Sequence, residues 1–202
     1  SVVGCSFTAT DLYFIIMIKF CYLLIVVLTL GNNCLNGQND LTQYVKPEVG
    51  SDSEFALSNG NVYPCIARPF GMNHWTPQTA NNGERWQYNY ADHHIVGFKQ
   101  THQPSPWVGD YGMFSIMPSV GEKSFLEKDR RSWYSHKAET ILPHFYQVYL
   151  ADYDVEASLV PGERSAMMRF EFPESSKSNI IIDAFNDDSY IKVFPKEQKV
   201  VG

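Results

Sequence analysis

The chain has 202 residues, of which 44% are hydrophobic and 19% charged, and it contains 13 Phe, 12 Tyr and 4 Trp. Burying that much apolar surface offsets the entropy lost on ordering, so the composition excludes a disordered chain. The 13 glycines and 11 prolines exclude a collagen-like or low-complexity protein. The net charge of -6 argues against a nucleic-acid-binding protein, which would carry a basic patch.

The first long apolar segment runs from Tyr13 to Leu30 and contains one charged residue, Lys19. About 18 such residues are just enough for a transmembrane helix, so an uncleaved anchor is one interpretation. A start residue, Met17, followed by one positive charge and a short apolar core from Phe20 to Leu28, is more typical of a secretory signal peptide. We therefore expect residues 1–37 to be an upstream leader plus a signal peptide, and the protein to be secreted or periplasmic.

The part of the chain that follows contains one cysteine, Cys65. An exported domain with a single cysteine has no internal disulfide, so its stability has to come from its core. The neighbours of Cys65 show no sign of an activated thiol.

From Leu41 onward no segment keeps a helical apolar period beyond about two turns. Short runs with alternating or β-branched apolar residues occur instead, and turn residues such as Pro161–Arg164 separate them. The run 179–185 is typical of a strand buried on both faces. These runs predict an all-β fold, an antiparallel β-sandwich over residues 38–202. The expected strands cover residues 94–99, 113–117, 145–150, 154–159, 166–172, 179–185 and 190–194.

Two long loops are expected, over residues 68–90 and 101–112, and both are rich in Trp, Tyr, His, Asn and Pro. Loops of this length in a compact domain are usually functional or disordered, and the aromatic density argues against disorder. Flat rings beside short polar side chains are suited to binding sugars. For any single ring, a place in the core is equally favoured. The rings and polar residues concerned are Trp75, Trp86, Tyr88, Tyr90, Trp107 and Tyr111, with Asn73, His74, Asn81, His102 and Asp110.

Motifs for other chemistry are absent from the sequence. His74 and the pair His93-His94 lack the spacing of metal ligands. No Gly-x-Ser-x-Gly turn and no glycine-rich phosphate loop occurs. Acidic residues such as Glu139 and Asp110 are available for acid–base chemistry, but the sequence does not pair them. From chemistry alone, the chain is a secreted β domain with a sugar-binding surface.

A set of short motifs, in a fixed order, resembles the opening of a family-92 glycoside hydrolase. The resemblance extends from Leu41 to about Pro173. Each motif is unspecific alone, but the ordered set is specific. The motifs are Tyr44–Gly50, Gly60–Pro64, Arg68–Met72, Tyr88–Tyr90, Ile95–Phe98, Thr101–Trp107, Gly109–Gly112, Ser135-His136, Glu139 and Pro143–Tyr146.

The resemblance implies a calcium-dependent, exo-acting α-mannosidase that inverts the anomeric centre. Members have an N-terminal β-sandwich followed by a larger α/α-toroid catalytic domain, so this chain would stop before the catalytic domain. Inversion needs a carboxylic acid and a carboxylate base on opposite faces of the sugar. In the family both come from the toroid, as do the calcium contacts. We therefore expect no catalytic residue and no metal ligand in this chain, and its partners to be a mannose-containing glycan and the missing domain.

The resemblance also implies one substrate contact from this domain. Trp86 matches best the tryptophan that lines the subsite beyond the cleaved bond. Members commonly have a doubled tryptophan in this segment, whereas Glu84–Tyr88 contains the single Trp86. This departure bears on which mannosidic linkage the enzyme prefers. For His102 and Asp110 we expect a structural role, with sugar contact as the lesser alternative. Two other classes remain open: a free-standing, non-catalytic carbohydrate-binding β-sandwich, and a membrane-tethered interaction domain.

Overall fold

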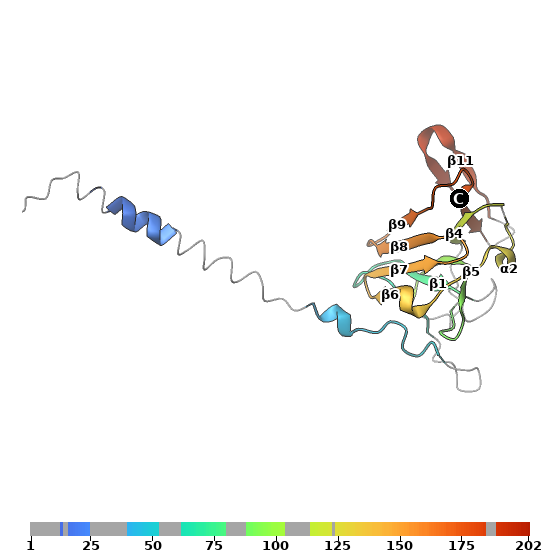
Figure 1. Ribbon diagram of the computed structural model, residues 1–202, viewed down its shortest axis with the longest axis horizontal. Coiled ribbons are helices and arrows are strands. Elements are labelled where there is room, and N and C mark those ends of the chain that lie inside the picture. Colours follow the sequence, from blue (N-terminus) through green and yellow to red (C-terminus); the bar gives the residue numbers. More distant parts are fainter. Residues whose placement is uncertain are drawn as a thin grey trace, which may run out of the picture. The chain divides into compact units, whose positions relative to one another are not determined.

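The computed structural model describes residues 13, 16–24, 40–52, 62–79, 88–103, 114–122, 124–184 and 189–202 (Figure 1). The chain divides into two compact units, residues 1–41 and residues 42–202. In the first unit, residues 16–24 are helical and exposed. No helix within the described ranges is long and apolar enough to cross a membrane. Most of the expected leader and signal peptide lies outside the described residues, so that interpretation stays a prediction.

The second unit is built on two four-stranded antiparallel sheets. One sheet has the strand order β1-β3-β4-β10, and the other has the order β6-β7-β8-β9. The strands of the first sheet are β1 (His74–Gln78), β3 (Gly97–Thr101), β4 (Phe114–Val120) and β10 (Ser178–Ala184). Those of the second are β6 (Glu139–Leu142), β7 (Phe145–Leu150), β8 (Val155–Pro161) and β9 (Ala166–Glu171).

Shorter elements connect and flank these sheets. Two strand pairs stand outside them: β2 (His94–Ile95) with β5 (Ser132–Trp133), and β11 (Lys192–Phe194) with β12 (Lys199–Val201). The one-turn helix α2 (Glu127–Arg130) follows β4. Three 3-10 turns complete the described elements: η1 (Leu41–Tyr44), η3 (His136–Ala138) and η4 (Pro195–Glu197).

The second sheet follows directly from residue alternation. Along β8, Val155, Ala157, Leu159 and Pro161 are buried, whereas Glu156 and Val160 between them are exposed. Successive side chains of a strand point to opposite faces, so this pattern gives the sheet one apolar face. Its connections are short, as at Gly162, whose amide donates to the Ser165 carbonyl at 2.6 Å to close the β8–β9 turn.

Residues from both sheets share one core. Phe98 on β3 lies 5.9 Å, centroid to centroid, from Tyr146 on β7 and 6.3 Å from Phe170 on β9. Their fully buried neighbours include Met117 on β4 and Val148 and Leu150 on β7. The prediction of an all-β fold with antiparallel sheets is confirmed.

Two strand predictions need correction. The expected loop 68–90 contains β1, whose Pro77 disfavours a central strand. A proline is tolerated here because β1 is an edge strand, paired with β3 alone. The run 179–185 was expected to be buried on both faces, but Ile180 is 55% exposed. β10 pairs with β4 alone and forms the opposite edge of the sheet. Among the described residues no strand pairs with its other edge, so its side chains have neighbours on one side only.

Candidate functional site

The expected site residues lie on segments that leave the β1–β3 pair at opposite ends. Trp86 belongs to segment 80–87 and Asp110 to segment 104–113, both outside the described residues. Segment 80–87 begins beside Gln78, which pairs with Gly97. His102 is exposed and directly follows Thr101, which pairs with His74 at the other end of β1. A strand advances about 3.3 Å per residue, so the two ends of β1, His74 and Gln78, are roughly 13 Å apart. The described residues therefore do not bring the starts of the two segments together.

Hydrogen bonds hold both ends of segment 80–87. The Thr79 hydroxyl donates to Asp92 Oδ2 at 2.8 Å and accepts from the Asn89 amide at 2.9 Å. One residue earlier, the Gln78 carbonyl accepts from the Val96 amide at 2.8 Å. Thr79 and Asn89, on the two sides of this segment in sequence, are therefore bonded to each other. Two polar clusters include residues next to these positions, Gln78 in one and Tyr88 in the other.

The first, which we name the tyrosine cluster, surrounds a buried carboxylate. Glu139 Oε1 accepts from the Tyr146 hydroxyl at 2.5 Å, and Glu139 Oε2 lies 2.6 Å from His136 Nδ1. The His136 ring stacks on Tyr90 with centroids 3.9 Å apart and an interplanar angle of 4°. The cluster consists of Tyr88, Tyr90, Tyr134, His136, Glu139 and Tyr146.

Burial dominates the electrostatics of the tyrosine cluster. The Glu139 side chain is only 2% exposed. This desolvation raises the pKa of Glu139, while the hydrogen bonds from Tyr146 and His136 act against the rise. Burial also raises the pKa of Tyr88, Tyr134 and Tyr146, and the nearby Glu139 charge adds to each rise. The Tyr88 and Tyr134 hydroxyls influence each other, but neither makes a well-formed hydrogen bond among the described residues.

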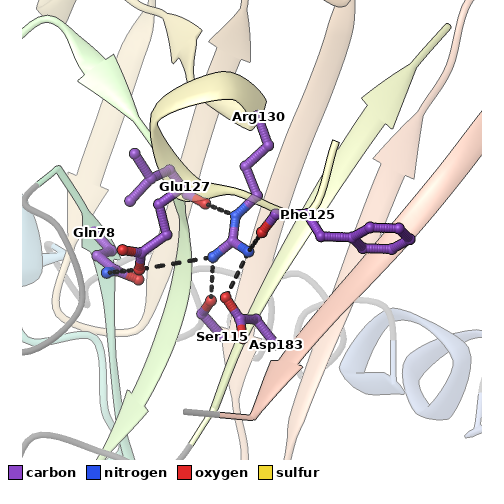
Figure 2. Close-up of polar contacts among 7 residues, drawn as sticks. Gln78, Ser115, Phe125, Glu127, Arg130 and Asp183 are labelled. Atoms are coloured by element: carbon purple, nitrogen blue, oxygen red, sulfur yellow. Dashed lines mark hydrogen bonds and ion pairs between the residues drawn. The ribbon is translucent and has the colours of Figure 1, made fainter. Parts of the chain in front are cut away.

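Figure 2 shows the contacts of Arg130 in the second cluster, which we name the arginine cluster. Arg130 on α2 is 1% exposed and donates from Nη1 to Asp183 Oδ2 at 2.5 Å. It also donates to the carbonyls of Val96, at 3.0 Å, and Phe125, at 3.1 Å. Gln78 Nε2 donates to Glu127 Oε1 at 3.1 Å, which connects β1 to α2. The cluster consists of Gln78, Lys99, Ser115, Glu127, Arg130 and Asp183.

Strand register explains why the arginine cluster forms on one face of the sheet. Thr76 pairs with Lys99, Lys99 with Ser115, and Ser115 with Asp183, so one polar row crosses all four strands. Gly97 leaves room beside this row, since a Cβ there would lie 2.9 Å from Ser115 Oγ. Lys99 and Arg130 carry no sequence signal that distinguishes them from ordinary surface charges in a strand and a loop, so the sequence alone does not predict this cluster.

Lys99 is the buried titratable cation of the arginine cluster. Its side chain is fully buried, and desolvation lowers its pKa to about 8. The carboxylates of Glu127 and Asp183 act in the opposite direction by attracting the ammonium charge. Lys99 and Arg130 thus lie among two carboxylates, which balances the formal charge of the cluster.

Several rings considered for a sugar-binding surface belong to the core. Trp75 is 5% exposed, and its Nε1 donates to Asn73 Oδ1 at 2.6 Å. Tyr88 is 2% exposed. Tyr90 lies against His136, whose Nε2 is 2.8 Å from the Tyr90 carbonyl. For Trp75, Asn73 and Tyr88 the structural interpretation therefore holds. Trp107 and Tyr111 lie outside the described residues.

The described residues do not assemble a hydrolytic centre. Glu139 is enclosed by aromatic rings, and Glu127 and Asp183 are engaged by Arg130. No group of three or more His, Cys, Asp or Glu side chains within the described ranges is arranged to hold a metal ion. Cys65 is a free thiol whose pKa burial raises to about 12, so it is not an activated nucleophile.

Comparison with known protein families matches residues 44–202 to the glycosyl hydrolase family 92 N-terminal domain. Among solved structures, the chain is 42% identical to the family GH92 inverting mannosidase BT2199 of Bacteroides thetaiotaomicron VPI-5482, with a TM-score of 0.74. It is 37% identical to the family GH92 alpha-mannosidase BT3965 of Bacteroides thetaiotaomicron, with a TM-score of 0.63. Comparison with curated proteins gave no match.

These similarities cover most of this chain but a small part of the related structures. The match to BT2199 covers 81% of this chain and 22% of that protein, and the match to BT3965 covers 73% and 20%. The chain therefore spans about a fifth of the related mannosidases.

Proposed function

Because the chain belongs to glycoside hydrolase family 92 through its N-terminal domain, we propose that it is the β-sandwich domain of a secreted, inverting α-mannosidase. The observation that carries the proposal is the family match over residues 44–202, together with 42% identity to an inverting mannosidase. In this proposal the domain contacts a terminal α-mannoside of a glycan, and a larger domain that follows it supplies catalysis.

The proposed substrate contact is Trp86, in the segment whose base is closed by Thr79 and Asn89. A tryptophan ring packs against the C–H face of a sugar and gives contact area at little entropic cost. For His102, which is exposed at the far end of the β1–β3 pair, and for Asp110 we propose a structural role, holding the loop 101–112 against the larger domain, with sugar contact as the lesser alternative. In the proposed enzyme the catalytic acid and base, and the calcium ion, belong to the other domain. The described residues offer no fitting group of ligands for calcium, so we assign it no role here.

An apolar surface supports the presence of a further domain. Phe114, Ile182, Tyr190 and Val200 line an open pocket of about 510 Å³ where the β11–β12 hairpin meets β4 and β10. On the same hairpin Val193 is 60% exposed. Apolar patches of this kind mark interaction surfaces. We propose that the catalytic domain covers this one.

The test is Trp86→Ala in the complete enzyme, assayed on an α-mannobiose. Losing the ring contact is expected to cost about 1–3 kcal/mol in kcat/KM. Trp133→Ala is the matched control, because Trp133 is 44% exposed on β5 and has no proposed sugar contact. Equal kinetics for Trp86→Ala and the wild type would show that Trp86 does not line a subsite. Hydrolysis of mannosides by residues 38–202 alone would contradict the assignment of catalysis to another domain.

A further inference from the structure

The turn that precedes β1 presents a phenylalanine in an unusual backbone conformation. Its two arms are joined by an antiparallel bridge, in which Ile66 and Trp75 exchange backbone hydrogen bonds of 2.9 Å. The Gly71 amide donates to the Arg68 carbonyl at 2.9 Å and closes the turn. Phe70 lies inside the turn with a φ of 58°, in the left-handed region, which bulky side chains rarely adopt.

This turn, residues 68–72, which we name the aromatic turn, is held at one end of the second sheet. Its Met72 amide donates to the Glu163 carbonyl at 2.8 Å, in the connection from β8 to β9. Just before the turn, the Ala67 amide donates to the Pro143 carbonyl at 2.8 Å, in the connection from β6 to β7. The turn is thus bonded to two hairpins of the same sheet, so its backbone is fixed from both sides.

Phe70 is unfavourably placed in this chain in two respects. Its side chain is 102% exposed, and that of Met72 beside it is 57% exposed. Its φ angle suits glycine, so a bulky side chain at this position raises the free energy of the folded chain. A strained and exposed aromatic residue on a fixed turn points to a contact made outside this chain.

The size of this apolar surface limits what the contact can be. One phenylalanine buries about 150–250 Å². A stable interface between separate molecules buries about 800 Å² on each partner. Phe70 and Met72 provide much less than that. A domain joined to this chain by a linker needs far less contact area, because the linker keeps it at an effective concentration of about millimolar.

The aromatic turn also lies close to the apolar pocket beside the β11–β12 hairpin. The Trp75 ring meets the Phe114 ring edge-on with centroids 5.8 Å apart, and Phe114 lines that pocket. Met72 precedes Trp75 by three residues, which span at most about 11 Å of extended chain. The two apolar surfaces are therefore neighbours, and one partner can cover both.

We propose that Phe70 is a docking anchor: its ring inserts into an apolar recess of the larger domain and fixes this domain against it. The inference rests on the proposed function, because that function supplies the larger domain. Aromatic side chains that fill a desolvated pocket contribute much of the energy of an interface. Burial of the ring on docking offsets the strain that the left-handed backbone of Phe70 places on the separate chain.

Three variants separate the ring from the backbone strain. Phe70→Ala removes the ring and keeps a side chain in the left-handed region. Phe70→Gly removes the ring and also relieves the strain. Phe125→Ala is the matched control, because Phe125 is 70% exposed and its φ angle is not positive.

The first measurement compares thermal midpoints in the 202-residue chain and in the complete enzyme. In the chain, Phe70→Ala should leave the midpoint unchanged, and Phe70→Gly should raise it or leave it unchanged. In the complete enzyme both variants should lower the midpoint by at least about 2 °C, whereas Phe125→Ala should change neither form. A loss for Phe70→Ala that is as large in the chain as in the enzyme would overturn the proposal. Equal losses for Phe70→Ala and Phe125→Ala in the enzyme would do the same.

The second measurement locates the contact directly. Hydroxyl radicals oxidise side chains that water reaches, and mass spectrometry identifies the oxidised residues. Oxidation of Phe70 and Met72 should fall at least about fivefold from the 202-residue chain to the complete enzyme, since an anchor in a recess excludes water. Protection of Phe70 that grows with the concentration of the 202-residue chain alone would indicate a second copy, which overturns the assignment of the partner.

The activity of the wild-type complete enzyme on an α-mannobiose separates the two proposals. If the enzyme hydrolyses the mannobiose while Phe70 is oxidised as fast as in the 202-residue chain, the docking role fails and the proposed function stands. If the enzyme hydrolyses no mannoside while Phe70 is protected, the proposed function fails and the docking role stands.

Discussion

The two polar clusters beside the end of β1 are held together by different kinds of charge. In the arginine cluster, Arg130 is a permanent cation that bonds two backbone carbonyls and the Asp183 carboxylate. In the tyrosine cluster, the corresponding contacts of His136 and Glu139 depend on one proton. The contacts of Arg130 therefore keep their charge, whereas the contact between His136 and Glu139 needs a proton between its two atoms. The two clusters thus hold a carboxylate in different ways, one with a permanent cation and the other with hydrogen bonds from Tyr and His side chains.

The largest effect is expected from removing the permanent cation. Arg130→Met removes the cation that pairs with Asp183 and lies near Glu127, which keeps its hydrogen bond from Gln78. The carbonyls of Val96 and Phe125 also lose the Arg130 donor. Breaking a buried ion pair in this way costs about 3–5 kcal/mol in the free energy of unfolding. Urea denaturation followed by circular dichroism measures it.

The control is Arg169→Met, which removes an ion pair to Glu171 at a site where the side chains are 75% and 51% exposed. That change should cost at most about 1 kcal/mol. Similar losses of unfolding free energy in the two variants would show that Arg130 stabilises the fold no more than an exposed ion pair does.

A smaller loss of stability is expected in the tyrosine cluster, where the hydroxyls of Tyr146 and Tyr134 should contribute differently. Tyr146→Phe removes the donor to Glu139 Oε1 and leaves a buried carboxyl oxygen unsatisfied, which should cost about 1–3 kcal/mol. Tyr134→Phe removes a buried hydroxyl without a well-formed hydrogen bond among the described residues and should change stability by less than about 0.5 kcal/mol. The same denaturation experiment compares them, and a larger loss for Tyr134→Phe would reverse the assignment of the anchoring hydroxyl.

A further effect is a pH dependence that originates in the arginine cluster. The folded-state pKa of Lys99 is about 8, below its ordinary value of 10.5. Between these values the unfolded chain binds more protons than the folded one, so stability from Lys99 rises with pH. The slope is at most about 1.4 kcal/mol per pH unit.

Lys99→Met should remove this rise. The measurement is the difference in unfolding free energy between wild type and variant at pH 7, 8, 9 and 10. A constant difference over that range would show that Lys99 is not the titrating group.

The fold was predictable where alternation controls burial. The strand predicted at 145–150 coincides with β7, and the strands predicted at 154–159 and 166–172 correspond to β8 and β9. β1 was not predicted because a proline, Pro77, argues against a strand in the sequence. The proline is compatible with β1 because β1 is an edge strand, which the sequence does not reveal. For β10, the apolar run 179–185 indicated double burial, but edge placement is a tertiary property that alternation does not encode.

The candidate site was predictable only in part. Ser135-His136 and Glu139 are among the family-like motifs. The contact of His136 with Tyr90, 46 residues earlier, depends on the pairing of β2 with β5, which the sequence does not show. Arg130 and Asp183 are 53 residues apart and meet only through the pairing of β10 with β4. Nothing in their local sequence distinguishes them from surface charges. Trp86, His102 and Asp110 stay predictions.

The pairing of β10 with β4 has a consequence for how the chain acquires its structure during synthesis. The whole second sheet, from Glu139 to Glu171, lies between these two partners in sequence. That sheet is a local meander whose contacts form early, whereas the β4–β10 pairing has to close a long loop. A nascent chain that ends before residue 178 lacks both the edge of the first sheet and the carboxylate of Asp183. Arg130 therefore gains the Asp183 carboxylate only after β10 has been synthesised, and we expect the arginine cluster to be completed late in the folding of this domain.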